Sequence, residues 1–216
     1  MTAKGVNYPN VFKKELGGKT VNLRSCDTLF SLFLGYYPKM KLGWDDDRRR
    51  WTVSILNFFA ELGKFYGYQV WLKPDYGVRN INNKETREWL VDLCWYFEAE
   101  YFTAHWVELA LESELSSQTI DDILYDFWKL TDIKAFMKVG IFAPKLSKKE
   151  SLLQELIAVV AQHGIKIPTE KYLIILILYH GKVEDETKRI EIDGYEINYL
   201  GDFKRIGSKR FPVKPL

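Results

Sequence analysis

The chain has few of the residues from which cysteine-based sites are built. Among 216 residues there are two cysteines, Cys26 and Cys94, and three histidines without the spacing of metal ligands. Cys94 lies within an apolar run, as a buried thiol does. No disulfide framework or cysteine zinc site is therefore expected, and a reducing compartment, the cytoplasm, is the expected location.

Long hydrophobic runs and a strong net charge are also missing. The most apolar stretch, residues 173–179, is seven residues long, whereas a helix needs about 20 to cross a bilayer. The net charge of +2 excludes a polycation but allows a local basic groove. With 47% hydrophobic and 28% charged residues, the chain can bury a core and stay soluble.

Apolar periodicity predicts one helix followed by three short strands. The helix runs from acids at residues 45–47, which cap it, to Gly67, which ends it. The three strands are expected at 68–72, 87–97 and 106–115. A helix over 117–133, capped by Ser116 or Ser117, and a strand at 135–142 follow.

The rest of the chain predicts further α/β structure. We expect a helix opened by a capping box of Ser147 and Glu150 and ended by Gly164, a buried strand at 171–179, and a hairpin that turns at Asp193 and Gly194. Three strands before the first crossover favour a mixed α/β fold, a central mixed sheet flanked by helices on both sides. The expected organisation is a single domain over 1–216, with an N-terminal extension (1–44), a core (45–143) and a C-terminal part (144–216).

Three carboxylates on two of these strands need an explanation. Glu112 and Glu114 alternate along the third strand and share one face, where they repel each other unless a cation lies between them. Asp92 interrupts an apolar run, and a buried acid is costly unless something pairs with it. Because a short connection favours adjacent strands, Asp92 is expected to face Glu112.

In these residues and this order of elements, the chain resembles the PD-(D/E)XK nuclease superfamily. That family's core is helix, three strands, helix, strand, with an acid on the second strand and a (D/E)-x-K pair on the third. Asp92 matches the first acid, and Glu112-x-Glu114 matches the pair with Glu in place of Lys, a form that some type II restriction enzymes carry. The resemblance covers about residues 48–143 and implies a Mg²⁺- or Mn²⁺-dependent endonuclease that hydrolyses phosphodiester bonds in DNA, acting as a homodimer.

The resemblance also implies roles for these residues. Asp92, Glu112 and the Ser113 carbonyl would hold the metal, which would lower the pKa of a bound water. Glu114 would orient or deprotonate that water, or bind a second metal.

Further candidates at the site are implied less directly. The additional acid on the family's first helix corresponds to Glu61. With no lysine in the motif, Lys129 or Lys134 is a candidate for the cation beside the phosphate.

Other readings stay open at this point. A competing register uses Pro74 and Asp75 with Glu98 and Glu100 as the acids. Glu112 and Glu114 could instead be solvated, and Asp92 could be a structural hydrogen-bond acceptor.

Basic residues could supply contacts to nucleic acid. A set near the C-terminus is either an electrostatic footprint or a solvated tail: Lys204, Arg205, Lys209 and Arg210. The arginines at 48–50 either contact phosphates or pair with the three aspartates before them.

Two other classes of protein compete with a nuclease. A non-catalytic nucleic-acid-binding protein on the same scaffold is favoured by the missing lysine. A glycosidase is disfavoured, because its carboxylates flank a cleft from opposite sides, whereas Glu112 and Glu114 lie two residues apart on one strand.

Overall fold

The computed structural model describes residues 21–42, 47–73, 90–97, 106–116, 119–181 and 189–213. Their strands form one seven-stranded sheet in which each strand pairs with its neighbours in sequence. The strands are β1 (Gln69–Leu72), β2 (Leu93–Phe97), β3 (Trp106–Glu114), β4 (Ala135–Phe142), β5 (Lys171–His180), β6 (Arg189–Asn198) and β7 (Phe203–Pro212). The sheet joins the expected core to the expected C-terminal part through the pairing of β4 with β5.

The sheet is mixed, as the sequence predicts. β1, β2 and β3 are antiparallel, β3, β4 and β5 are parallel, and β5, β6 and β7 are antiparallel again. Both parallel pairs are joined by a helical crossover, because parallel neighbours need a long connection. The mixed α/β fold class is therefore confirmed, and so is the order helix, three strands, helix, strand from α3 to β4.

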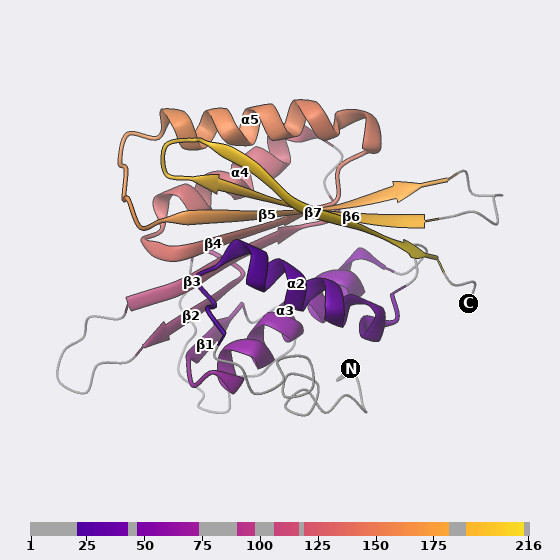
Figure 1. Ribbon diagram of the computed structural model, residues 1–216, viewed down its shortest axis with the longest axis horizontal. Helices are drawn as coiled ribbons and strands as arrows, with labels where there is room; N and C mark the ends of the chain where they lie inside the picture. The colour runs from indigo at the N-terminus through magenta and orange to yellow at the C-terminus, as the bar shows by residue number, and fades with distance from the viewer. Residues whose placement is uncertain are drawn as a thin grey trace.

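Helices cover both faces of the sheet and give three layers (Figure 1). One face packs against α2 (Cys26–Tyr36) and α3 (Arg48–Phe65), and the other against α4 (Ile120–Asp132) and α5 (Lys149–Gln162). Two short 3₁₀ helices, η1 (Tyr37–Met40) and η3 (Leu146–Lys148), complete the set in the described residues. The helix α2, which lies in the expected N-terminal extension, contacts β5, β6 and β7 and is part of the domain.

The helix α3 begins and ends where the sequence predicts. The Asp47 carboxylate accepts a hydrogen bond from the Arg49 N–H at 3.1 Å and caps the first turn. Gly67 follows the last turn with φ +84°, a conformation that glycine adopts without a steric penalty. Trp95 on β2 donates from Nε1 to the Phe59 carbonyl at 3.0 Å, which fixes α3 on the sheet.

Two predicted helix caps are wrong. Thr119, and not Ser116 or Ser117, caps α4, and its hydroxyl accepts from the Asp122 N–H. The predicted capping box does not form, because Ser147 lies inside the 3₁₀ turn η3. α5 then starts at Lys149 without a side-chain cap and ends at Gln162.

The predicted hairpin turn is also wrong. Asp193 and Gly194 lie in the middle of β6, and the chain turns at residues 199–202 before β7. Gly194 is needed for close packing, because a Cβ there would lie 2.7 Å from the Phe30 ring of α2. The Asp-Gly sequence, which is typical of a hairpin turn, here lies where the helix α2 packs closely against the sheet.

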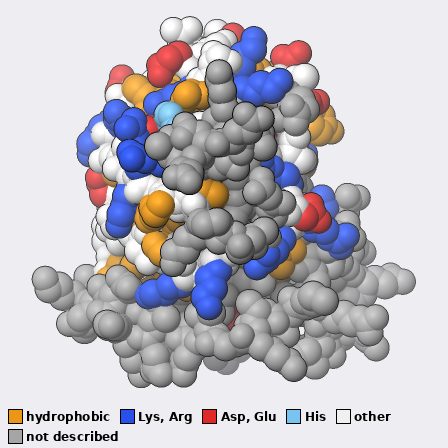
Figure 2. Space-filling view, turned by 90° about the vertical axis from the view of Figure 1, so that its right-hand side faces the viewer, with side chains coloured by type: hydrophobic (Ala, Val, Ile, Leu, Met, Phe, Trp, Pro, Cys, Tyr) orange, Lys and Arg blue, Asp and Glu red, His pale blue; other side chains and the backbone are white. Residues whose placement is uncertain are grey.

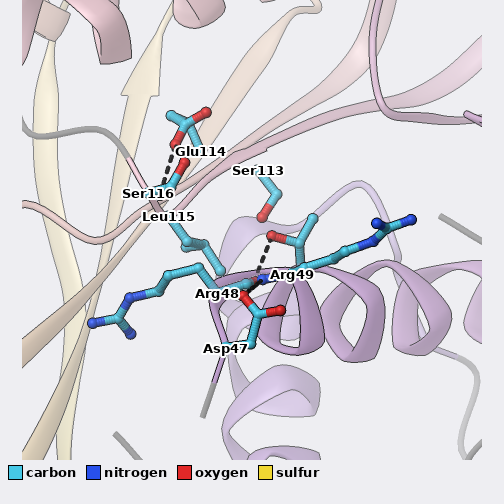
Figure 3. A pocket seen from close by; sticks show the side chains of 8 residues that line it. Asp47, Arg48, Arg49, Ser113, Glu114, Leu115 and Ser116 are labelled. Atoms are coloured by element: carbon cyan, nitrogen blue, oxygen red, sulfur yellow. Dashed lines mark hydrogen bonds between the residues drawn. The ribbon is translucent and has the colours of Figure 1, made fainter. Parts of the chain in front are cut away.

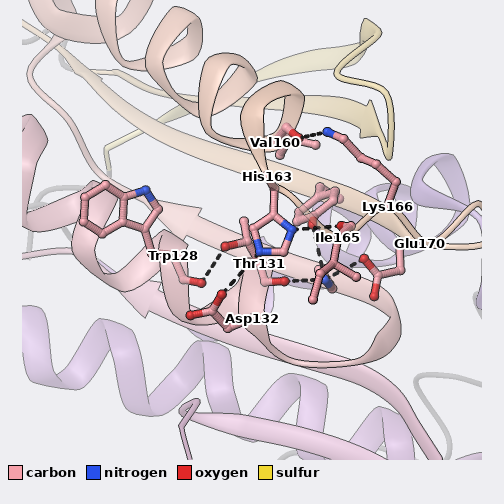
Figure 4. A network of polar contacts seen from close by, with 10 residues as sticks. Trp128, Thr131, Asp132, Val160, His163, Ile165, Lys166 and Glu170 are labelled. Carbon is pink, nitrogen blue, oxygen red and sulfur yellow. Dashed lines mark hydrogen bonds and ion pairs between the residues drawn. The ribbon is translucent and has the colours of Figure 1, made fainter.

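A buried polar network fixes the ends of α4 and α5 to the sheet (Figure 4). The Lys138 ammonium, fully buried on β4, donates to Glu170 at 2.7 Å and to the Thr131 carbonyl at 3.2 Å. His163, which follows α5, contacts the Asp132 carboxylate at 3.3 Å. Each buried charge has a partner, so the network is structural.

No helix within the described parts of the chain combines the length and the apolar character that a bilayer span requires.

Candidate functional site

Asp92 and Glu112 lie together at one end of the sheet. Glu112 is near the end of β3, and Asp92 immediately precedes β2, outside the strand that was predicted to contain it. Because β2 and β3 are antiparallel, these two positions are adjacent. The Asp92 Oδ2 atom accepts a hydrogen bond from the Ser113 N–H at 3.1 Å, and the two carboxyl groups are close enough for each to shift the pKa of the other.

Both acids are buried, with 5% of Asp92 and 3% of Glu112 exposed. Burial raises the pKa of Glu112 to about 10, and the neighbouring Asp92 charge adds to this shift. Burial also raises the pKa of Asp92, although the Ser113 N–H and the Glu112 contact oppose the rise. Burial and mutual repulsion favour one bound proton on the pair, and the charge of Lys129 opposes this by lowering the pKa of Glu112.

Two lysines border the pair. The Lys129 ammonium of α4 lies 3.8 Å from Glu112 and 2.5 Å from the Asp126 carboxylate. The Lys73 ammonium lies 4.0 Å from Asp92, and the Lys73 N–H also donates to the Asp92 carbonyl at 2.9 Å. Lys129, one of the two lysines predicted to stand in for the motif lysine, therefore lies at the acids.

Two residues beside the acids, Lys73 and Asp126, were not predicted from the sequence. Lys73 directly follows β1, whose end lies beside the start of β2, and Asp126 stands one helical turn before Lys129. The position of Lys73 depends on strand pairing, which a single sequence leaves open, whereas Asp126 could have been found from its helical spacing to Lys129. Lys134, the other lysine considered, is exposed after α4.

The structure separates Glu114 from the pair. Its carboxylate accepts hydrogen bonds from the Ser116 N–H at 2.7 Å and the Ser116 hydroxyl at 2.8 Å. The expected acidic face of three carboxylates is thus a pair with Glu114 beyond it.

Glu61 and Glu108 also point elsewhere. Glu61 pairs with Lys64 at 2.8 Å on α3, which covers the face of the sheet opposite to α4, so the prediction that it joins the pair is wrong. Strict strand alternation would place Glu108 on the same face as Glu112. The β2–β3 register shifts at this point, and Glu108 binds Arg24 instead, at 2.5 and 2.8 Å.

The basic residues predicted to contact nucleic acid lie on β7 and have partners within the protein. Arg205 contacts Asp193 at 2.9 Å and Arg210 contacts Glu191 at 2.7 Å, and both acids are buried on β6. The other two are Lys204, 3.5 Å from Asp27, and Lys209, over the Phe211 ring. These contacts offset much of the positive charge of β7.

The acids of the competing register, Asp75, Glu98 and Glu100, lie outside the described residues.

The donor set at the pair suits a hard divalent cation. No group of three or more aspartate, glutamate, histidine or cysteine side chains that could hold a metal occurs in the described part of the chain. Mg²⁺ does not require one, because it commonly takes one or two carboxylates and completes its octahedron with waters and phosphate oxygens. The buried carboxylates of Asp92 and Glu112 could supply two such protein ligands to Mg²⁺.

Comparisons with known proteins give no match. No family model, curated protein or solved structure is similar to this chain. The interpretation of the site therefore depends on its geometry and on the motif resemblance.

Proposed function

We propose that the protein is a Mg²⁺- or Mn²⁺-dependent endonuclease that hydrolyses phosphodiester bonds in DNA. The observation that carries the proposal is the contact between the buried carboxyl groups of Asp92 and Glu112, with the Lys129 ammonium 3.8 Å from Glu112. A structural role accounts for Asp92, which accepts a hydrogen bond from the Ser113 N–H, but it does not account for a second buried acid beside it.

A metal ion replaces the shared proton in this proposal. Asp92 and Glu112 bind the ion, with the Ser113 carbonyl as the third protein ligand expected from the motif. The Ser113 N–H holds Asp92 in place, which fixes one ligand before the metal arrives. When bound, the ion lowers the pKa of a coordinated water and neutralises charge on the phosphate in the transition state.

Lys129 is proposed to act in place of the motif lysine. Its ammonium is a quarter exposed and reaches the acids from α4, so a phosphate oxygen can approach it from solvent. Asp126, at 2.5 Å, holds the ammonium in position. The position at the carboxyl end of β3, which is parallel to β4, is where α/β sheets commonly bind ligands. Cutting both strands of a duplex requires two such sites, so a homodimer is proposed by analogy with the family.

One observation favours a second candidate, a non-catalytic DNA-binding protein. Glu114 stands where the motif has lysine, and its carboxylate is bonded to Ser116 rather than directed at the acid pair. The motif position thus supplies no group to activate water.

An assay on several DNA substrates separates the two candidates. Supercoiled, linear and branched DNA are incubated with the protein in Mg²⁺, in Mn²⁺ and in EDTA, alongside Asp92→Asn and Glu112→Gln. Glu155→Gln, an exposed acid on α5, is the matched control. The proposal predicts metal-dependent cutting that falls at least about 100-fold in both site variants, as for the loss of a catalytic metal ligand, and is unchanged in the control.

Binding without cutting in every metal would favour the non-catalytic protein. Undiminished cutting by both site variants would show that another site performs the hydrolysis.

A further inference from the structure

A second polar site lies at the same end of β3, on the opposite face of the sheet. A solvent-open pocket of about 540 Å³ separates the first turn of α3 from the end of β3 (Figure 3). Its lining comes from these two segments and consists of Asp47, Arg48, Arg49, Thr52, Ser113, Glu114, Leu115 and Ser116.

The Ser113 hydroxyl faces this pocket without a partner. Ser113 is 6% exposed, and its Oγ atom has no hydrogen-bond partner among the described residues. In Figure 3 it points toward the first turn of α3 while Glu114 points the other way, as strand alternation requires. A buried hydroxyl without a protein partner is destabilising unless a group from outside the protein bonds it, and a ligand in the pocket could supply that group.

The opposite wall of the pocket favours an anion. It is the N-terminus of an 18-residue helix, whose dipole places partial positive charge at this end. Two arginines, Arg48 and Arg49, belong to the same turn. Burial lowers the pKa of Arg48, so its guanidinium has lost part of its hydration.

The two acids of the pocket are directed at other donors. Asp47 accepts from the Arg49 N–H, and Glu114 accepts from Ser116. Figure 2 shows the end of the molecule where β5 and β7 finish, with basic side chains spread over it and fewer acidic ones among them.

We propose that this pocket binds a phosphate group of the DNA strand that the acid pair cleaves. The inference rests on the proposed function and extends it with a second contact to the same strand. Ser113 connects the two sites, because its N–H holds Asp92 on one face of the sheet and its hydroxyl enters the pocket on the other. A strand that crosses the end of β3 would place one phosphate at the acids and a nearby one at Ser113 and the arginines.

Binding measured without cleavage tests this proposal. Fluorescein-labelled single-stranded and duplex oligonucleotides are titrated with the 216-residue chain in EDTA, and inorganic phosphate is titrated in a separate arm. Ser113→Ala removes one hydroxyl donor and leaves the backbone N–H on Asp92 in place. Ser54→Ala, on α3 with its hydroxyl bonded to the Arg50 carbonyl, is the matched control.

We expect Ser113→Ala to weaken oligonucleotide binding about tenfold, as for the loss of a hydrogen bond to a charged group, and Ser54→Ala to leave it unchanged. Thermal unfolding without ligand provides a second readout. Because the hydroxyl lacks a partner, Ser113→Ala should be as stable as the natural protein or more so, whereas a purely structural serine would lose stability.

Equal oligonucleotide affinity in Ser113→Ala and the natural protein would overturn the proposal. Saturable phosphate binding that Ser113→Ala abolishes, with unchanged oligonucleotide affinity, would assign the pocket to free phosphate and overturn the DNA strand as its source. The result is independent of the catalytic proposal, because cleavage that survives Asp92→Asn and Glu112→Gln would refute the acid pair while leaving a Ser113-dependent affinity intact.

Discussion

The backbone N–H of Ser113 donates a hydrogen bond to the Asp92 carboxylate at 3.1 Å. This bond connects the residue before β2 to the end of β3, so the acid keeps its position although it lies outside the strand. The same bond holds the Asp92 side chain beside Glu112, which precedes Ser113 in the chain.

Substitutions of Asp92 should separate its structural role from its chemical one. The side-chain oxygen of Asp92→Asn still accepts from the Ser113 N–H, so its unfolding free energy should stay close to that of the natural protein. Asp92→Ala leaves a buried N–H without a partner and should lose about 1–3 kcal/mol. Urea unfolding measures both. Equal losses in the two variants would show that the hydrogen bond does not stabilise the fold.

Glu112 should make the protein less stable as the pH rises, which is the opposite of the usual effect of a paired carboxylate. Its pKa rises from 4.5 in the unfolded chain to about 10 in the fold, so the folded state binds the extra proton between these values. The free energy of unfolding is therefore highest, as far as Glu112 is concerned, below pH 4.5. It falls as the pH rises from 4.5 toward 10, because the folded state must then either keep a proton that the unfolded chain has released or bury a charge. Glu112→Gln, which stays neutral, should be more stable than the natural protein at pH 8, by about 2 kcal/mol or more, and equal to it near pH 4.

Thermal unfolding across this pH range provides the measurement. Mg²⁺ should raise the unfolding temperature of the natural protein at pH 8, because the ion takes the place of the proton, and should leave Glu112→Gln unchanged. A natural protein that grows more stable than Glu112→Gln as the pH rises would contradict the assignment of the proton.

Lys129 should set the pH at which the site works. Its ammonium lowers the pKa of Glu112, so Lys129→Met should move the rise of metal-dependent cleavage to higher pH and reduce the rate at pH 7 by about tenfold or more. Lys129→Arg keeps the charge and should retain more of the activity. Lys134→Met, an exposed lysine just after α4, is the control. The same pH profile for all three variants would remove Lys129 from the site.

Close packing at Gly194 predicts a loss of stability on adding one methyl group. Gly194→Ala should cost about 1–3 kcal/mol, because its Cβ would lie 2.7 Å from the Phe30 ring. Gly164→Ala, where no atom lies within 4 Å, is the matched control. Chemical denaturation measures the unfolding free energy of both variants, each alone and combined with Phe30→Leu. The free energy lost on Gly194→Ala should be smaller in the Phe30→Leu background, where the opposing side chain is smaller. A loss that persists there would point to backbone strain in β6 instead.

Periodicity was enough to predict most elements of this fold. The apolar spacing of α3 and the alternation in β3 are local properties, so a sequence pattern identifies them directly. The acid pair was predictable for the same reason, since Asp92 interrupts an apolar run and Glu112 alternates with apolar neighbours.

Tertiary contacts decided the features that were wrong. Asp193 and Gly194 imitate a hairpin turn, but the glycine accommodates Phe30 from a helix about 160 residues earlier in the chain, a contact that no local pattern reveals. Glu108 leaves the face of Glu112 because the strand register shifts, and Glu61 lies on a helix that covers the other face. Lys73 approaches Asp92 only after β1 has paired with β2.

Iron-directed cleavage of the protein itself tests the central claim, that Asp92 and Glu112 hold a divalent cation. Fe²⁺ bound in place of Mg²⁺, with ascorbate and peroxide, releases hydroxyl radicals that cut the backbone next to the ion, and mass spectrometry locates the cuts. The account predicts cuts near residues 92 and 112 that excess Mg²⁺ suppresses and that the Asp92→Asn, Glu112→Gln double variant lacks. Cuts elsewhere, or the same cuts in the double variant, would contradict it.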